Sequence, residues 1–80
     1  MNDEVIAVGG WMVKVIKPNP IGGQPMQQWF AVGTVKKPDA EARAREYLHR
    51  SDITIDARRR LTATEIKTIR LRLYEVRAYE

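Results

Sequence analysis

Few side chains in this 80-residue chain could take part in catalysis. The sequence contains one histidine, His49, and one serine, Ser51. They are two positions apart, so on a helix they would point in different directions, and no third group at a recognisable spacing could orient the imidazole. Asp52 and Asp56 could form a carboxylate pair, but acids this close to arginines are more often their solvent-facing partners. We therefore expect no catalytic residues and a protein that is not an enzyme.

The sequence also lacks the usual ligands for metals and cofactors. One histidine and no cysteine leave no cluster of nitrogen and sulfur atoms that could hold zinc. The pair Gly22-Gly23 is not followed by Lys-Ser or Lys-Thr and opens no helix, so it does not resemble a phosphate-binding loop. We expect neither a metal nor a cofactor.

The absence of cysteine rules out a disulfide framework and favours a cytoplasmic location. The apolar run Val5–Val13 is too short to span a bilayer. It follows Asp3 and Glu4, where a signal peptide would carry lysine or arginine. We expect no targeting segment and no membrane partner.

The positive charge is concentrated at the C-terminal end. The chain has 14 basic and 10 acidic residues, for a net charge of +4. Basic and acidic residues balance up to residue 57, so the whole excess lies in residues 58–80. If a strand and a helix meet at a sharp corner here, five cations could converge on a nucleic-acid backbone. These candidate phosphate contacts are Arg58, Arg59, Arg60, Lys67 and Arg70.

Two observations weaken this nucleic-acid hypothesis. Consecutive strand residues point to opposite faces, which would separate Arg59 from Arg58 and Arg60. No helix-turn-helix, RNP-like or zinc pattern accompanies the cluster. A solvated basic surface is the simpler interpretation, and nucleic-acid binding is the alternative function.

Residues 26–50 form the unit around which the other elements are expected to pack. Trp29–Val35 is aromatic and β-branched, which is typical of a strand. Pro38 and the neighbouring acids then mark the start of a helix. An apolar stripe on that helix consists of Ala40, Ala44, Tyr47 and Leu48. Its other face carries acid-before-base pairs four residues apart, which predict a solvated structural face: Asp39 with Arg43, Glu41 with Arg45, and Glu46 with Arg50.

A hairpin is predicted before this unit. Val5–Lys17 alternates like a strand interrupted at Gly9-Gly10, and residues 18–25 hold three prolines and two glycines, a hairpin loop. If Lys17 faces Met26, Trp11 opposes Val32 and Val13 opposes Phe30, on the face that the helix covers. The other face then exposes a candidate protein-contact surface of Trp29, Met12, Ile16 and Lys14. A slip of one residue would exchange Trp29 for Phe30 in the core.

The C-terminal part is less determined. Ile53 to Arg58 alternates as a third strand that should pair with the hairpin, and Thr62 to Glu65 has the spacing of a capping box that starts a short helix. The last ten residues fit both a continued helical stripe through Leu73 and Val76 and the alternation of a final strand.

The expected fold is therefore a single α+β domain over residues 1–80, a small ββαβ-type sheet with one amphipathic helix on one face, a short C-terminal helix and a possible last strand. We expect residues 1–4 to be disordered. A chain this short has a small core, which dimerisation would reinforce. No motif determines a biological role. The leading hypothesis is a non-enzymatic module that contacts a protein partner or a second copy of itself.

Overall fold

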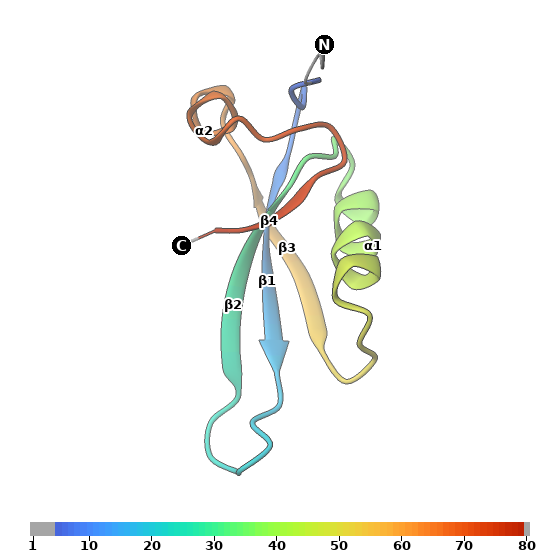
Figure 1. The fold of residues 1–80 in the computed structure, drawn as a ribbon, viewed down its shortest axis with the longest axis vertical. Helices are drawn as coiled ribbons and strands as arrows, with labels where there is room; N and C mark the ends of the chain where they lie inside the picture. The colour runs from blue at the N-terminus through green and yellow to red at the C-terminus, as the bar shows by residue number, and fades with distance from the viewer. Residues whose placement is uncertain (1–4, 80) are drawn as a thin grey trace.

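Four antiparallel strands and two helices make up the computed structural model, which describes residues 5–79 (Figure 1). This confirms the α+β fold; the disorder expected for residues 1–4 lies outside the described residues. The elements are β1 (Trp11–Lys17), β2 (Met26–Val32), α1 (Lys37–Leu48), β3 (Thr54–Arg60), α2 (Ala63–Ile69) and β4 (Val76–Ala78).

The hairpin of β1 and β2 has the predicted register. Lys17 lies opposite Met26 and Trp11 opposite Val32. Because side chains alternate along a strand, this register buries Phe30, which is 2% exposed, and turns Trp29 to the other face. The loop that sets the register contains Gly22 and Gly23, both with positive φ angles that suit glycine.

The strand order in the sheet is β3-β1-β2-β4. The third strand pairs with β1, and the short β4 pairs with residues 30–32 of β2, which confirms the possible last strand. The helical alternative for the end of the chain is wrong, because α2 stops at Ile69. Arg70 adopts the left-handed conformation, with φ 54°, and its N–H bonds back to the helix carbonyls.

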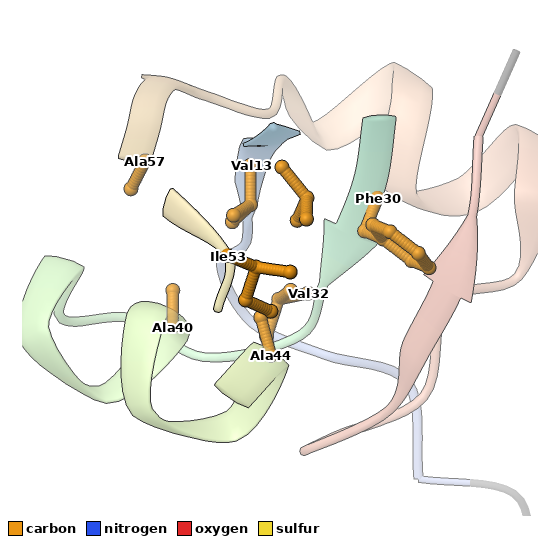
Figure 2. Packing of buried hydrophobic residues seen from close by; sticks show 8 residues of the cluster. Val13, Phe30, Val32, Ala40, Ala44, Ile53 and Ala57 are labelled. Carbon is orange, nitrogen blue, oxygen red and sulfur yellow. The ribbon is translucent and has the colours of Figure 1, made fainter. Parts of the chain in front are cut away.

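Helix α1 covers one face of the sheet (Figures 1 and 2). Ala40 and Ala44 are fully buried, and their small side chains let the helix lie close to the strands. Tyr47 departs from the predicted stripe, since it is 57% exposed and touches the Phe30 ring edge-on, with 6.1 Å between centroids. At about 100° per residue it lies roughly 60° around the helix from Ala44, whereas Leu48 lies only about 40° away. The buried cluster comprises Val13, Val15, Phe30, Val32, Ala40, Ala44, Ile53 and Ala57.

The opposite face of the sheet, called the second face below, carries a core of its own. Helix α2 lies at the end of the sheet remote from the hairpin loop (Figure 1) and contributes Ile66 to this core. The other buried members are Ala7, Met12, Ala31, Leu61 and Leu71. The second face is therefore partly covered. This cover is more complete than expected from the sequence, which predicted only one helix packed on the sheet, on the other face.

The acid–base pairs expected along α1 have other partners. Glu41 accepts a hydrogen bond from the Ala57 N–H at 3.0 Å, which ties the helix to β3. Arg50 makes two bonds to Asp52, at 2.7 and 2.9 Å. Arg43 reaches Glu46, three residues on, at 3.7 Å. Glu41 and Arg50 thus bond to groups outside the helix, and Arg43 pairs within it at a spacing of three residues and not four.

Candidate functional site

Met12 is not on the surface, contrary to expectation. It is 4% exposed, because α2 and Leu71 belong to the core that packs over its end of the second face. Trp29, Ile16 and Lys14 lie nearer the hairpin loop and are half-buried. The predicted contact surface is therefore divided into a covered part around Met12 and an uncovered part.

The uncovered part is called the open face and consists of Lys14, Ile16, Gln27, Trp29, Thr54 and Asp56. It is built from two cross-strand rows. In one row Lys14 lies between Trp29 of β2 and Asp56 of β3. In the other row Ile16 lies between two polar residues on the same strands. The surface thus presents an indole and an aliphatic side chain beside one cation and one anion.

A shallow pocket marks the border between the covered part and the open face. Met12, Trp29, Arg59 and Tyr79 line it, and its volume is about 310 Å³. The Tyr79 N–H donates to the Trp29 carbonyl at 2.8 Å, which continues the pairing begun by β4. Met12 can therefore contribute to a contact only from within this pocket.

The edge of β2 has unpaired backbone groups beside the open face. In an antiparallel strand the N–H and C=O of one residue point to the same side, and the side alternates along the strand. Since the Trp29 carbonyl faces Tyr79 at the outer edge, the N–H and C=O of Gln27 face that edge too. The adjoining strand β4 begins and ends opposite residues 30–32 and leaves Gln27 unpaired on that side among residues 5–79.

Because β3 contains a bulge, the three consecutive arginines Arg58, Arg59 and Arg60 contact three different neighbours. Val13 opposes Ala57 and Met12 opposes Arg59, so Arg58 is the extra residue. Arg58 bonds to Asp56 at 2.8 Å. Arg60 lies over the Trp11 ring, 5.5 Å from its centroid.

Arg59, the middle residue, forms two hydrogen bonds with Glu65, at 2.8 and 2.9 Å. That bond and the Thr62 N–H lower the pKa of the Glu65 carboxyl to about 2. Glu65 and Thr62 form the predicted capping box. Lys67 and Arg70, the other two cations of the proposed phosphate site, lie exposed on α2 and at its C-terminal end.

Asp52 and Asp56 act as partners of arginine, as expected. The Arg50 bond lowers the pKa of Asp52, and the Arg58 bond does the same for Asp56. His49 ends α1 in the left-handed conformation, with φ 53°, and its N–H donates to the Arg45 carbonyl. Within residues 5–79 no three acidic or histidine side chains gather to hold a metal ion.

The sequence analysis missed one site, a groove between α1 and the turn before β4. Arg43 donates to the Tyr74 carbonyl at 2.8 Å, and its guanidinium lies 5.6 Å from the centroid of the Tyr74 ring. The two residues are 31 positions apart, and neither belongs to a motif. Only the fold could reveal this pairing.

None of the helices among the described residues is long and apolar enough to cross a membrane. Comparison of the chain with protein-family models, curated proteins and solved structures finds no match.

Proposed function

We propose that this protein is a non-enzymatic contact module that associates with a second copy of itself through the open face. The observation that carries the proposal is the incomplete cover of the second face. Leu61, Ile66 and Leu71 form one core with Met12 and Ala31, while Trp29, at the edge of this core, and Ile16 stay half-buried. Clusters of exposed aromatic and aliphatic side chains with a polar rim are typical of interaction sites. A cytoplasmic location stays a prediction.

The charges of the open face favour a second copy as the occupant. Lys14 and Asp56 are adjacent in one cross-strand row, so the face is close to neutral on a protein of charge +4. Two copies related by a twofold axis can place each Lys14 ammonium near the Asp56 carboxylate of the other, with one Trp29 indole on the outer side of each pair. Such a face is complementary to itself.

The size of the open face predicts a weak dimer. Three strands about 4.8 Å apart and three residues of about 3.3 Å each give a face of roughly 14 by 10 Å. Stable interfaces bury about 800 Å² on each partner, several times this footprint. We therefore expect dissociation constants of tens of micromolar or above, by order of magnitude.

Sedimentation velocity from 10 µM to 1 mM protein, concentrations of the order that such affinities require, tests the proposal. The average mass should rise with concentration and change little between moderate and high salt, since apolar contacts are not screened. In a Trp11→Phe background, which leaves Trp29 as the only tryptophan, the emission should shift to the blue over the same range.

Ile16→Lys should abolish this association, because it places a second cation on the open face. Ile21→Lys is the matched control, since Ile21 is 93% exposed in the hairpin loop, outside the strands that form the open face. A strict monomer with a water-exposed Trp29 would refute the proposal. Equal losses from the two variants would show that net charge, and not the open face, governs association.

Nucleic-acid binding through the C-terminal cations is the second candidate. It is supported by the exposure of all five side chains, Arg58, Arg59, Arg60, Lys67 and Arg70. It is weakened by the separate partners that the three consecutive arginines have within the fold. The dependence of binding on salt distinguishes it from self-association and is argued in the Discussion.

A further inference from the structure

The shallow pocket at the border of the open face takes one residue from each part of the sheet. Met12 on β1 lies opposite Arg59 on β3, Trp29 belongs to β2, and Tyr79 directly follows β4. The Tyr79 N–H bonds to the Trp29 carbonyl, and both aromatic side chains pack at the edge of the second-face core. The pocket thus combines a buried thioether, two half-buried rings and one guanidinium.

The Arg59 guanidinium is held in place and still has donors to offer. Its Nη1 atom donates to Glu65 and to the Arg60 carbonyl, and its Nη2 atom donates to the other Glu65 oxygen. A guanidinium has five N–H groups, so the Nε–H and one Nη2–H have no acceptor among residues 5–79. These two groups lie along one edge of the planar group, the arrangement that binds a carboxylate with two hydrogen bonds.

The two aromatic residues add further unpartnered donors. Neither the Trp29 indole N–H nor the Tyr79 hydroxyl bonds to a group within residues 5–79. The other indole, that of Trp11, does have a partner and donates to the Val35 carbonyl at 2.9 Å. Tryptophan and tyrosine usually find an acceptor for their polar atoms when they are buried. The side chains that line this pocket therefore have donors available and need acceptors.

The charge of the pocket has one sign. None of its four lining residues is acidic, because Glu65 holds the Arg59 guanidinium from outside the pocket. The hydrogen bond to Glu65 is the main cause that raises the pKa of Arg59, and Tyr79 adds a smaller electrostatic contribution. The complement of this arrangement is an anionic acceptor joined to a flat apolar group, since rings stack on rings and a methionine sulfur contacts the edge of a ring.

We propose that this pocket binds a small aromatic carboxylate. The carboxylate accepts from the free edge of Arg59, and the aromatic ring lies against Trp29, Tyr79 and Met12. The volume of about 310 Å³ lies at the lower end of the roughly 300–1,000 Å³ of pockets for small ligands, which suits a single ring. The pocket is complete within one copy of the chain, so the proposal does not rest on self-association.

Titration of the ¹⁵N-labelled protein with phenylacetate tests the proposal. Two-dimensional NMR follows the Arg59 Nε–H and the Trp29 Nε1–H directly, and we expect both signals to shift and to saturate. The matched probes are acetate, which lacks the ring, and phenylacetamide, which lacks the charge. Each should bind at least about tenfold more weakly than phenylacetate, as expected when one strong contact is removed.

Arg59→Lys tests the role of the guanidinium edge. The variant keeps the positive charge and removes the paired donors, so phenylacetate should bind about tenfold more weakly. Arg45→Lys is the matched control, because Arg45 is exposed on α1 and does not line the pocket.

Tyr79→Phe tests the pocket without disturbing the bond between Arg59 and Glu65. It removes only the hydroxyl, so the affinity for phenylacetate should fall by roughly threefold to tenfold, the contribution of one hydrogen bond. Tyr47→Phe is the matched control, since this ring is exposed on α1 and touches Phe30.

Several results would overturn the proposal. They are the absence of saturable shifts, equal affinities for phenylacetate and either matched probe, and affinities that neither Arg59→Lys nor Tyr79→Phe lowers beyond its control. Sedimentation measures self-association and the NMR titration measures ligand binding. A strict monomer that binds phenylacetate would refute only the open-face dimer, and a dimer without saturable shifts would refute only the pocket.

Discussion

Arg59 and Glu65 join the end of β3 to the first turn of α2 by a bidentate ion pair. Two parallel N–H···O bonds of 2.9 and 2.8 Å connect them. The same Glu65 carboxylate accepts from the Thr62 N–H at 2.9 Å and completes the capping box. One side chain therefore both starts the helix and anchors it to the sheet, which keeps α2 over the second face.

This carboxylate should make stability depend on pH in acid. Its pKa lies at about 2, below the ordinary 4.5, so the charged form is favoured in the folded state. The stabilisation is fully present above pH 4.5 and is lost as the pH falls toward 2. Glu65→Gln should therefore flatten the fall in melting temperature between these pH values, measured by circular dichroism. Glu46→Gln is the control on α1, and an identical pH profile for Glu65→Gln and wild type would contradict the prediction.

Gly33 should tolerate no side chain. A Cβ atom there would lie 2.2 Å from the Arg72 carbonyl oxygen, which cannot move without displacing the turn before β4. Gly33→Ala should lower the free energy of unfolding by about 1–3 kcal/mol, the usual range for overpacking. Gly9→Ala is the control, because its nearest neighbour would be a Val35 side-chain atom at 3.4 Å. Urea denaturation measures both; equal stabilities for the two variants would show that the turn can shift freely.

The sequence predicts the hairpin and both helices because their signals are local. Strand alternation on each side of a loop with three prolines predicts the hairpin, and of the two registers considered the structure has the one in which Lys17 faces Met26. The Thr62–Glu65 spacing determines where α2 begins. Each inference depends on residues within a few positions of one another, where period and capping chemistry are decisive.

The missed features are contacts between distant segments. Nothing local indicates that Leu71 would lie over the second face and bury Met12. The Arg43–Tyr74 contact likewise requires β4 to return beside β2. The residue type of Tyr74 does not indicate a turn, because a residue in the left-handed conformation is expected to be glycine or asparagine. The candidate groove was therefore beyond sequence reasoning.

The core on the second face should be as necessary as the core under α1. Leu71 is fully buried there, so Leu71→Ala should lower the free energy of unfolding by about 2–5 kcal/mol. Ile21→Ala, in the exposed hairpin loop, should change it by less than about 0.5 kcal/mol. Chemical denaturation measures the free energy of unfolding of both variants, which can be compared directly when their m-values are the same. A loss below about 1 kcal/mol for Leu71→Ala would mean that α2 is only loosely attached.

Nucleic-acid binding, the second candidate function, predicts how strongly the binding affinity should depend on salt concentration. Five phosphate contacts by the C-terminal cations would give a slope of roughly −4 to −5 for log affinity against log salt on duplex DNA. Arg58→Gln with Arg60→Gln should lower affinity and reduce the slope by about two contacts. This pair leaves the Arg59–Glu65 link intact and so preserves the position of α2.

The matched control is Arg45→Gln with Lys36→Gln, which removes the same amount of positive charge. Arg45 lies in α1, and Lys36 directly precedes this helix. A specific C-terminal site requires the first pair to weaken binding clearly more than the control pair, since any protein with pI 9.8 adheres to polyanions at low salt. Equal losses of affinity from the two pairs of substitutions would show that the C-terminal cations form only a solvated basic surface. Because self-association through the open face should persist at salt concentrations that abolish binding to DNA, the same titration also separates the two proposed functions.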